Sequence, residues 1–219
     1  MNHVALRNEI VATCRAMNAL GLNQGTSGNV SVRAGDGFLL TPSGLDYASM
    51  EADDIVSMGF DGEYESERLP STEWRIHRDV LAWRSEACAV IHAHPMCCTT
   101  LAIHGLPIPA IHYLVGLAGG SEIRCAPYAT PTTQELSDVA IEALADRRAC
   151  LLAHHGAIVI DDSAASALAL LVEIENLAEQ YWRALQLGEP PLLSETDMNA
   201  VQDILEGYGR QADPELRKV

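Results

Sequence analysis

The sequence predicts an α/β domain in which helices alternate with short strands, the first of them antiparallel. Apolar residues recur at helical spacing in several segments, and short runs of aliphatic and β-branched residues lie between them. In the first third of the chain these runs are joined by turns too short for the crossovers that parallel strands need. The 219 residues can bury a full core and contain no repeat, low-complexity tract or linker. We therefore expect a single domain over residues 1–219.

The N-terminal third predicts one helix followed by a meander. Apolar residues from Leu6 to Leu20 follow helical spacing and stop at Gly21, which predicts an amphipathic first helix. Two antiparallel pairs with glycine-containing turns are expected next: residues 30–33 with 38–41 around Gly35-Asp36-Gly37, and residues 55–58 before the turn Asp61-Gly62.

The middle of the chain predicts a helix, a buried strand and a short second helix. An apolar stripe at helical spacing predicts a helix that runs from the N-cap Ser71 to about Arg84. The apolar run before His92 predicts a buried strand that ends at Pro95. Residues 96–103 then predict a short helix.

The second half predicts three further strands and three further helices. The strands are expected at residues 123–126, 150–153 and 157–160. The helices are expected after a capping box of Thr132 and Glu135, at residues 163–187 and, more weakly, at residues 201–205. Gly188 and Pro190 end the long helix, so an acidic, polar tail is expected from about residue 188.

The charge of the chain excludes two classes of partner. With 14 basic and 30 acidic residues the formal net charge is −16. Such a surface repels nucleic-acid backbones and anionic membranes, so we expect neither as a partner. A phosphorylated small molecule would have to bind through local groups rather than through general charge.

The six cysteines favour a reducing compartment. None forms a C-x-x-C pair, and the adjacent Cys97 and Cys98 are poorly placed to bond to each other. We expect them to be buried as small apolar residues, which favours a cytoplasmic protein. The N-terminus lacks the pattern of a signal peptide, and no apolar run is long enough for a membrane span.

His92 and His94 have a spacing that suggests a metal site. On a strand, side chains at i and i+2 leave the same face, so the two imidazoles are expected to lie together. A catalytic zinc site uses three protein ligands and keeps one position open. A third imidazole from His154 or His155, between two β-rich runs, would complete the set. The alternative is a pair of ordinary histidines, but buried imidazoles without partners would be costly.

Glu73 has two interpretations. In the first turn of a helix, a carboxylate is favourable against the helix dipole. Beside a zinc ion, it would serve as an occasional fourth ligand and as a general base. Its helix directly precedes the strand of His92, which is compatible with the second role.

Three loops of small residues could bind a phosphate without lysines. Residues 25–29, 43–44 and 71–72 all offer hydroxyls and exposed backbone N–H groups. If they converge, these groups and a helix N-terminus would hold an anion. Each loop alone is compatible with an ordinary turn or cap, and none has the spacing of a known nucleotide-binding fingerprint.

Five motifs occur in a fixed order along the chain. They are Gly-Leu-Asn-Gln-Gly-Thr-Ser-Gly-Asn-Val-Ser at 21–31, Thr-Pro-Ser-Gly at 41–44, Pro-Ser-Thr-Glu at 70–73, His-Ala-His-Pro at 92–95 and His-His-Gly at 154–156. In these motifs the chain resembles the class II aldolase/adducin family, and it is most similar to the L-fuculose-1-phosphate aldolase branch. The resemblance extends from about residue 5 to residue 187.

The resemblance implies a three-layer α/β/α sandwich around a mostly antiparallel sheet. It implies a homotetramer with active sites between subunits. It also implies zinc, with Mn²⁺ or Co²⁺ as alternatives, on His92, His94 and His155. Glu73 is implied as catalytic base and alternate ligand, and Tyr113 as a catalytic proton donor from the neighbouring subunit.

The resemblance also implies a phosphate site in the small-residue loops. Its implied residues are Thr26, Gly28, Asn29, Ser43, Gly44, Ser71 and Thr72. Tyr208 lies where the tail of the fuculose branch contributes a further tyrosine to the substrate. The tail sequence of this chain departs from that pattern, so this match is looser than the others.

The implied reaction is the reversible cleavage of a ketose 1-phosphate, of the L-fuculose 1-phosphate type, to dihydroxyacetone phosphate and an aldehyde. The family leaves alternatives open: an aldolase or dehydratase of 5-deoxyribulose or methylthioribulose 1-phosphate, a ketose-phosphate 4-epimerase, and a metal-free adducin-type binding domain. The epimerase branch carries an aspartate at the position of Glu73, and an adducin-type domain would lack the histidines. Both features of this chain therefore favour an aldolase.

Overall fold

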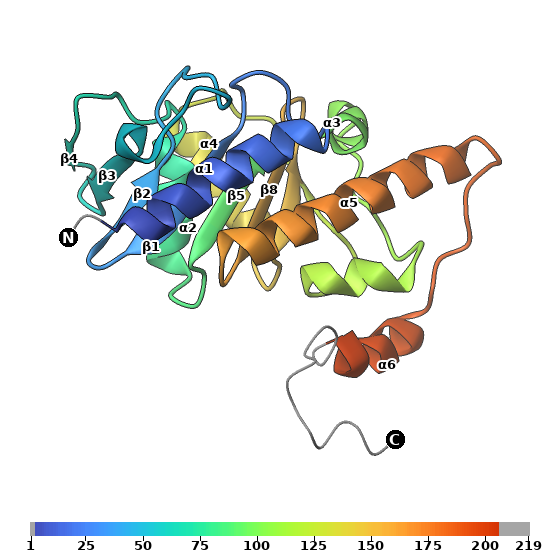
Figure 1. Ribbon diagram of the computed structural model, residues 1–219. Coiled ribbons are helices and arrows are strands. Elements are labelled where there is room, and N and C mark those ends of the chain that lie inside the picture. The colour runs from blue at the N-terminus through green and yellow to red at the C-terminus, as the bar shows by residue number, and fades with distance from the viewer. Residues whose placement is uncertain (1–2, 206–219) are drawn as a thin grey trace, which may run out of the picture.

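One sheet of eight strands organises residues 3–205, the part of the chain that the computed structural model describes (Figure 1). The strands are β1 (Asn29–Ala34), β2 (Gly37–Leu40), β3 (Val56–Gly59), β4 (Tyr64–Glu65), β5 (Ala89–Ala93), β6 (Cys125–Ala126), β7 (Ala149–Leu152) and β8 (Gly156–Asp161). Their order across the sheet is β4-β3-β2-β1-β5-β8-β7-β6. Every neighbouring pair is antiparallel except β6 and β7, so the expected mostly antiparallel sheet is confirmed.

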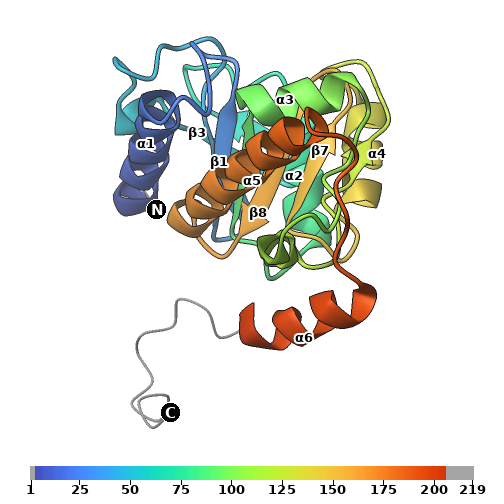
Figure 2. The same cartoon turned by 90° about the vertical axis from the view of Figure 1, so that its right-hand side faces the viewer.

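Helices cover both faces of this sheet. They are α1 (Val4–Ala19), α2 (Trp74–Trp83), α3 (Met96–Ile103), α4 (Gln134–Ala143), α5 (Ala164–Leu185) and α6 (Glu195–Leu205), with the 3-10 helices η1 (Ala52–Asp54) and η2 (Tyr113–Ala118). Helices α1 and α5 lie on one face, and α2 and α4 lie on the other (Figures 1 and 2). Each face has its own apolar core, so the molecule has the three layers that we expected. No helix among residues 3–205 is long and apolar enough to cross a membrane.

The centre of the sheet is formed by β5, which pairs with β1 on one side and β8 on the other. All five of its residues are buried, as the apolar run before His92 predicts. The predicted hairpin of β1 and β2 is confirmed, with Ala34 opposite Gly37 at the turn. Gly35 has a φ of 60° there, a conformation that glycine adopts at little cost. The pairing of β1 with β5 sets Asn29 opposite His92, so the start of β1 lies directly beside the end of β5.

Two predicted helix caps are wrong by one or two residues. Helix α2 begins at Trp74 with Glu73 as its N-cap, and the Ser71 hydroxyl instead accepts the Glu73 N–H at 3.3 Å. Helix α4 is capped by Thr133, whose side chain accepts the Leu136 N–H, so the expected box of Thr132 and Glu135 is not formed. Thr132 has a φ of 71°, which is incompatible with the extended backbone of a usual N-cap.

The remaining predicted elements differ mainly in length. Of the strand expected over residues 123–126, the structure retains β6, and Ile123 forms an isolated bridge with Ile108. The long helix is confirmed as α5, which is capped by Ser163. The last helix, α6, begins at Glu195 and is longer than the expected 201–205, because Met198 and Leu205 are buried against η2.

Candidate functional site

Three histidines meet at one end of the central strands. His92 lies on β5, His94 directly follows it, and His155 lies in the turn between β7 and β8. Because β5 and β8 are neighbours, with Ala93 opposite Ala157, this turn reaches the end of β5. The ring centroids are 4.7 to 5.0 Å apart, and one ligand atom from each histidine lies within 4.8 Å of the others.

The hydrogen bonds of His92 suit a metal ligand. Its Nδ1 lies 3.0 Å from the carbonyl oxygen of Ala157, which can only accept, so Nδ1 carries the proton. The Nε2 lone pair then faces His94 Nε2 at 2.9 Å and a carboxylate oxygen of Glu73 at 3.2 Å. Burial lowers the pKa of His92 to about 3, which keeps the ring neutral. A lone pair that faces a second imidazole nitrogen and a carboxylate can bind a cation between them, so the residues fit a metal ion.

Glu73 projects into this cluster from the N-terminus of α2. Its two carboxylate oxygens lie 3.2 Å from His92 Nε2 and 3.2 Å from His155 Nε2. Burial raises the pKa of Glu73, but His92, His155 and a hydrogen bond from Asn29 outweigh burial and hold it below its usual value. Glu73 is therefore a carboxylate, and its Oε1 is a buried atom without a hydrogen-bond partner.

Behind Glu73 lies a buried polar network that sequence reasoning missed. Asn29 Nδ2 donates to Glu73 Oε2 at 3.1 Å, and the Asn29 oxygen contacts His77 Nε2. His77 Nδ1 contacts the Ser31 hydroxyl at 2.7 Å. The signal in the sequence is the spacing: His77 follows Glu73 by one helical turn, and Ser31 follows Asn29 on the same face of β1.

The three small-residue loops lie side by side. The Thr41 side chain accepts the Val30 N–H at 3.2 Å, and its carbonyl oxygen accepts the Ser71 N–H at 3.0 Å. These bonds join the start of β1, the loop after β2 and the segment before α2. Gly28 lies against β5, where a side-chain Cβ would come within 2.8 Å of the His92 carbonyl oxygen. The loops therefore converge beside the histidine cluster.

The predicted phosphate residues differ in accessibility. Gly28, Asn29 and Ser71 are buried, whereas the other four are exposed: Thr26, Ser43, Gly44 and Thr72. The Ser43 N–H already donates to Leu69 at 2.9 Å, so Ser43 can offer a ligand its hydroxyl. The Asn29 amide is bonded to Glu73 and His77, which leaves one of its N–H bonds for another partner.

The other histidine of the pair does not join the cluster. His154 is exposed, has a φ of 56° and lies edge-on to Tyr128, with ring centroids 6.0 Å apart. Its backbone N–H donates to Ala102. The residue pattern alone left His154 and His155 open as the third imidazole, the family resemblance implied His155, and the structure brings His155 to the cluster.

Tyr113 lies away from the cluster within one chain. It is the first residue of η2, is 44% exposed and stacks on His112. Figures 1 and 2 show η2 at the bottom of the molecule near α6, whereas α3, which begins two residues after His94, lies at the top. Tyr208, the other predicted tyrosine, lies outside the described residues.

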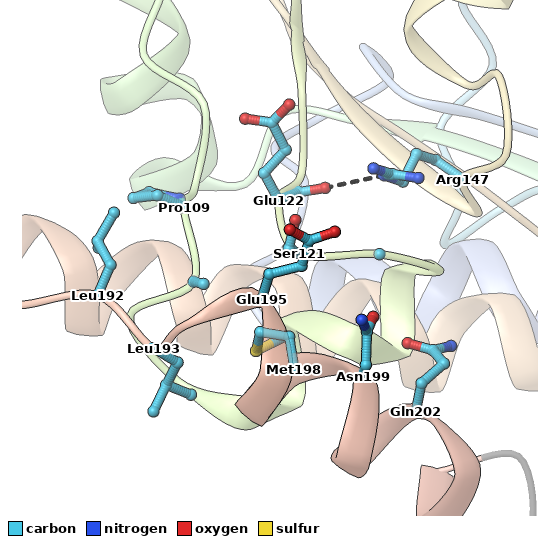
Figure 3. A pocket seen from close by; sticks show the side chains of 12 residues that line it. Pro109, Ser121, Glu122, Arg147, Leu192, Leu193, Glu195, Met198, Asn199 and Gln202 are labelled. Atoms are coloured by element: carbon cyan, nitrogen blue, oxygen red, sulfur yellow. Dashed lines mark hydrogen bonds between the residues drawn. The ribbon is translucent and has the colours of Figure 1, made fainter.

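A cavity of about 500 Å³ lies between α6 and the main body, distinct from the histidine cluster. Met198, Asn199 and Gln202 on α6 line it opposite Glu122 and Arg147 (Figure 3). The Arg147 guanidinium donates to backbone oxygens of Glu122 and of Gly119. These bonds brace the loop before β6, so we assign this cavity no part in the chemistry of the cluster.

The family described as "Class II Aldolase and Adducin N-terminal domain" matches residues 8–182. The chain belongs to the class II aldolase and adducin family. Members of the aldolase class are metal-dependent, and the three histidines of this chain could hold the ion.

Relatives within this family match the chain over nearly its full length. A 5-methylthioribulose-1-phosphate/5-deoxyribulose-1-phosphate aldolase of Rhodospirillum rubrum is 49% identical over 96% of both chains. An L-fuculose phosphate aldolase of Escherichia coli K12 is 44% identical over 95% of this chain and 98% of its own. A solved L-fuculose 1-phosphate aldolase superposes with a TM-score of 0.90 at 35% identity, covering 92% of this chain and 96% of that one. This protein is therefore an enzyme, a class II aldolase, which is a lyase.

Proposed function

We propose that this enzyme is a zinc-dependent aldolase that reversibly cleaves a ketose 1-phosphate to dihydroxyacetone phosphate and an aldehyde. The observation that carries the proposal is the convergence of three imidazoles on one buried carboxylate, beside three loops of small residues. Imidazole ligands favour zinc, and Mn²⁺ or Co²⁺ would also bind such a set.

His92, His94 and His155 would hold the ion, with Glu73 as an alternate ligand. When bound, the ion polarises the carbonyl group of the substrate and stabilises the negative charge that develops as the C3–C4 bond breaks. Glu73, held as a carboxylate, would take the proton from C3 as the general base in the condensation direction and return it to C3 in cleavage. The Oε1 atom of Glu73 has no hydrogen-bond partner in the protein, which leaves it available for this role.

The phosphate of the substrate would bind in the loops beside the cluster. The proposed contacts are Thr26, Gly28, Asn29, Ser43, Gly44, Ser71 and Thr72. Hydroxyls and backbone N–H groups hold an anion without a basic side chain, which is compatible with the acidic composition of the chain. The exposed members of this set leave an open path for the sugar phosphate.

Tyr113 from a neighbouring subunit would act on the oxygen at C4, donating a proton to it in condensation and accepting that proton in cleavage. Within one subunit, the helix that carries Tyr113 lies away from the histidine cluster, which supports a proton donor from a second subunit. We therefore propose a homotetramer with active sites between subunits. Tyr208 is proposed as a further contact to the substrate. The six cysteines are all free thiols, which supports a cytoplasmic location.

Two kinds of ketose phosphate are candidates for the substrate. The resemblance to fuculose-phosphate aldolases supports L-fuculose 1-phosphate. The somewhat higher identity of the R. rubrum aldolase supports 5-deoxyribulose and methylthioribulose 1-phosphate. These substrates share the phosphorylated end, which the loops would bind, and differ at the far end of the sugar.

The proposal is tested by metal analysis and a substrate panel. The purified protein should contain zinc, lose activity with a chelator and regain it with Zn²⁺. On L-fuculose, 5-deoxyribulose and methylthioribulose 1-phosphates, it should release dihydroxyacetone phosphate, which a coupled reductase assay detects. Glu73→Gln should retain zinc and lose at least about 100-fold in kcat, the usual contribution of a general base. Full turnover in this variant, or a metal-free active protein, would sink the proposal.

A further inference from the structure

Two fully buried polar side chains have no part in the proposed chemistry. Ser31 and His77 are both 0% exposed, yet each could have been replaced by an apolar residue of the core. Polar groups buried in this way are costly unless every one of them is hydrogen-bonded. Here they belong to a series of hydrogen bonds that ends on Glu73. This series of bonds connects β1 to α2.

The two elements match each other in spacing. Glu73, the N-cap of α2, and His77 in its first turns are four residues apart, a helical rise of about 6 Å. Asn29 and Ser31 are two residues apart on β1, a rise of about 6.6 Å. Both pairs therefore present neighbouring side chains at nearly the same interval. Asn29 reaches Glu73 at 3.1 Å, and His77 reaches both Ser31, at 2.7 Å, and Asn29, at 2.5 Å.

Each proton in this series of four hydrogen-bonded side chains has a defined position. Glu73 is a carboxylate and only accepts, so the amide nitrogen of Asn29 faces it and the amide oxygen faces His77. That oxygen only accepts, so His77 carries its proton on Nε2. Burial lowers the pKa of His77 to about 4, so the ring is neutral and its Nδ1 accepts from the Ser31 hydroxyl. Donation therefore runs in one direction, from Ser31 to Glu73.

This arrangement distinguishes the two oxygens of Glu73. Oε2 accepts the bond from Asn29, whereas Oε1 accepts none from this network and faces His155 Nε2 at 3.2 Å. A glutamate has three side-chain torsions, and without such a bond it would sample several orientations beside the metal position. Asn29 can donate to Oε2 only while its side-chain amide does not rotate by about 180°. The bond from His77 opposes this rotation, because the rotated amide would place its NH2 group against the Nε2–H of His77.

We propose that Ser31, His77 and Asn29 form a positioning relay that holds the Glu73 carboxylate in one orientation, with Oε1 turned to the histidine cluster. The relay rests on the proposed function, because it gives Glu73 its role as base. His77 and Ser31 touch neither substrate nor metal in this scheme and act only through Asn29. Asn29 thereby acts on the base as well as on the phosphate.

Two amide substitutions at position 77 test the relay. The amide nitrogen of His77→Gln can occupy the place of Nε2 and keep the bond to Asn29. The shorter side chain of His77→Asn reaches only the place of Nδ1 and loses that bond. Both variants are polar, uncharged and similar in volume, so a merely structural role predicts similar losses. We expect His77→Asn to lower kcat about 10- to 100-fold, the usual effect of removing such a supporting bond. His77→Gln should retain most of kcat.

Three further measurements separate orientation from folding. Zinc content should equal that of the wild type in both variants. Val80→Ala, which truncates a buried residue on the same helix, should lower the melting temperature without lowering kcat. Ser31→Ala, a small change at the far end of the relay, should lower kcat about two- to fivefold, less than His77→Asn.

Crystal structures of the zinc-loaded variants give a readout that needs no turnover. The Glu73 carboxylate should be displaced in His77→Asn and unmoved in His77→Gln. Equal kcat losses in the two variants, or an unmoved carboxylate in His77→Asn, would overturn the relay. A wild-type protein inactive on every ketose 1-phosphate of the panel would instead overturn the proposed function, and the crystal structures would then decide the relay alone.

Discussion

At the scale of single residues, the two adjacent histidines show how backbone conformation selects a ligand. His154 has a φ of 56°, a left-handed conformation that is uncommon outside glycine, and its side chain lies on the surface. His155, the next residue, places its Nε2 3.2 Å from Glu73. Residues of the same type, one bond apart in the chain, therefore face different surroundings.

We expect His155→Ala to lose bound zinc and His154→Ala to retain it. The first removes one of three imidazoles and leaves Glu73 beside an incomplete site, whereas the second removes only an exposed ring. Metal analysis of the dialysed proteins measures the difference, with His92→Ala as a reference for a lost ligand. Zinc loss in His154→Ala alone would reverse the assignment.

A second residue-scale prediction concerns stability and pH. Burial, partly offset by Glu73, lowers the pKa of His77 from 6.5 to about 4. Between these values the unfolded chain binds a proton that the folded chain does not, so stability falls as the pH falls. From pH 7 to pH 5 this group should remove about 2 kcal/mol of the free energy of unfolding. Urea unfolding should show that His77→Gln loses correspondingly less than the wild type. An equal loss would mean that His77 does not titrate in this way.

At the scale of elements, the start of α3 depends on a residue from α5. Pro95 is the N-cap of α3 and provides no side-chain bond. The Glu175 carboxylate instead accepts the N–H groups of Cys97 at 2.7 Å and Cys98 at 2.9 Å. A carboxylate at this position also interacts favourably with the helix dipole. Because α3 begins two residues after His94, this contact ties α5 to the segment that carries a predicted ligand.

We expect Glu175→Ala to destabilise the fold by about 1–3 kcal/mol, because two N–H groups lose their acceptor. Glu175→Gln should recover part of the loss, since an amide oxygen can still accept one of the bonds. Gln180→Ala, at an exposed position of the same helix, should change stability by less than about 0.5 kcal/mol. Denaturant unfolding measures all three. A Glu175→Ala protein as stable as the Gln180→Ala protein would contradict the capping role.

At the scale of the whole molecule, the arrangement of the sheet separates the predicted catalytic groups. Glu73 and the histidines lie at the end of β5 near α3, and Tyr113 lies on η2 at the other end, near α6 (Figures 1 and 2). Both ends carry residues that the resemblance assigns to one reaction. Under the proposed function, a single chain would provide two halves of a site, and assembly of copies would bring such halves together.

Mixing subunits tests this arrangement. Glu73→Gln and Tyr113→Phe proteins should each have low activity alone. After joint refolding in equal amounts, about a quarter of the sites in a random assembly pair an intact Glu73 with an intact Tyr113 from the neighbour. Activity should therefore rise to about a quarter of the wild-type value, and light scattering should report a tetramer. A mixture no more active than its components would show that Tyr113 does not act across an interface.

The sequence by itself determined the elements and most of the candidate site. The hairpin of β1 and β2, the buried strand β5 and the long helix α5 follow from local patterns, because turn residues and apolar periodicity act over a few residues. The spacing of His92 and His94 predicted that they share a face, and the structure brings them together with His155. The order of the motifs indicated the family, which the comparison confirms.

Only the tertiary structure decided which residues serve one another across the sheet. The role of His77 could not be read from the sequence, because its partners Asn29 and Ser31 lie more than 40 residues away and meet it only when α2 packs on β1. The residue pattern alone left His154 and His155 open, and the turn between β7 and β8 brings His155, the ligand that the family resemblance implied, to the cluster. The placement of η2, which carries Tyr113, away from α3 is likewise a property of the folded chain (Figures 1 and 2). Each follows from non-local packing: local spacing places side chains on one face of an element, but it does not say which element will pack against that face.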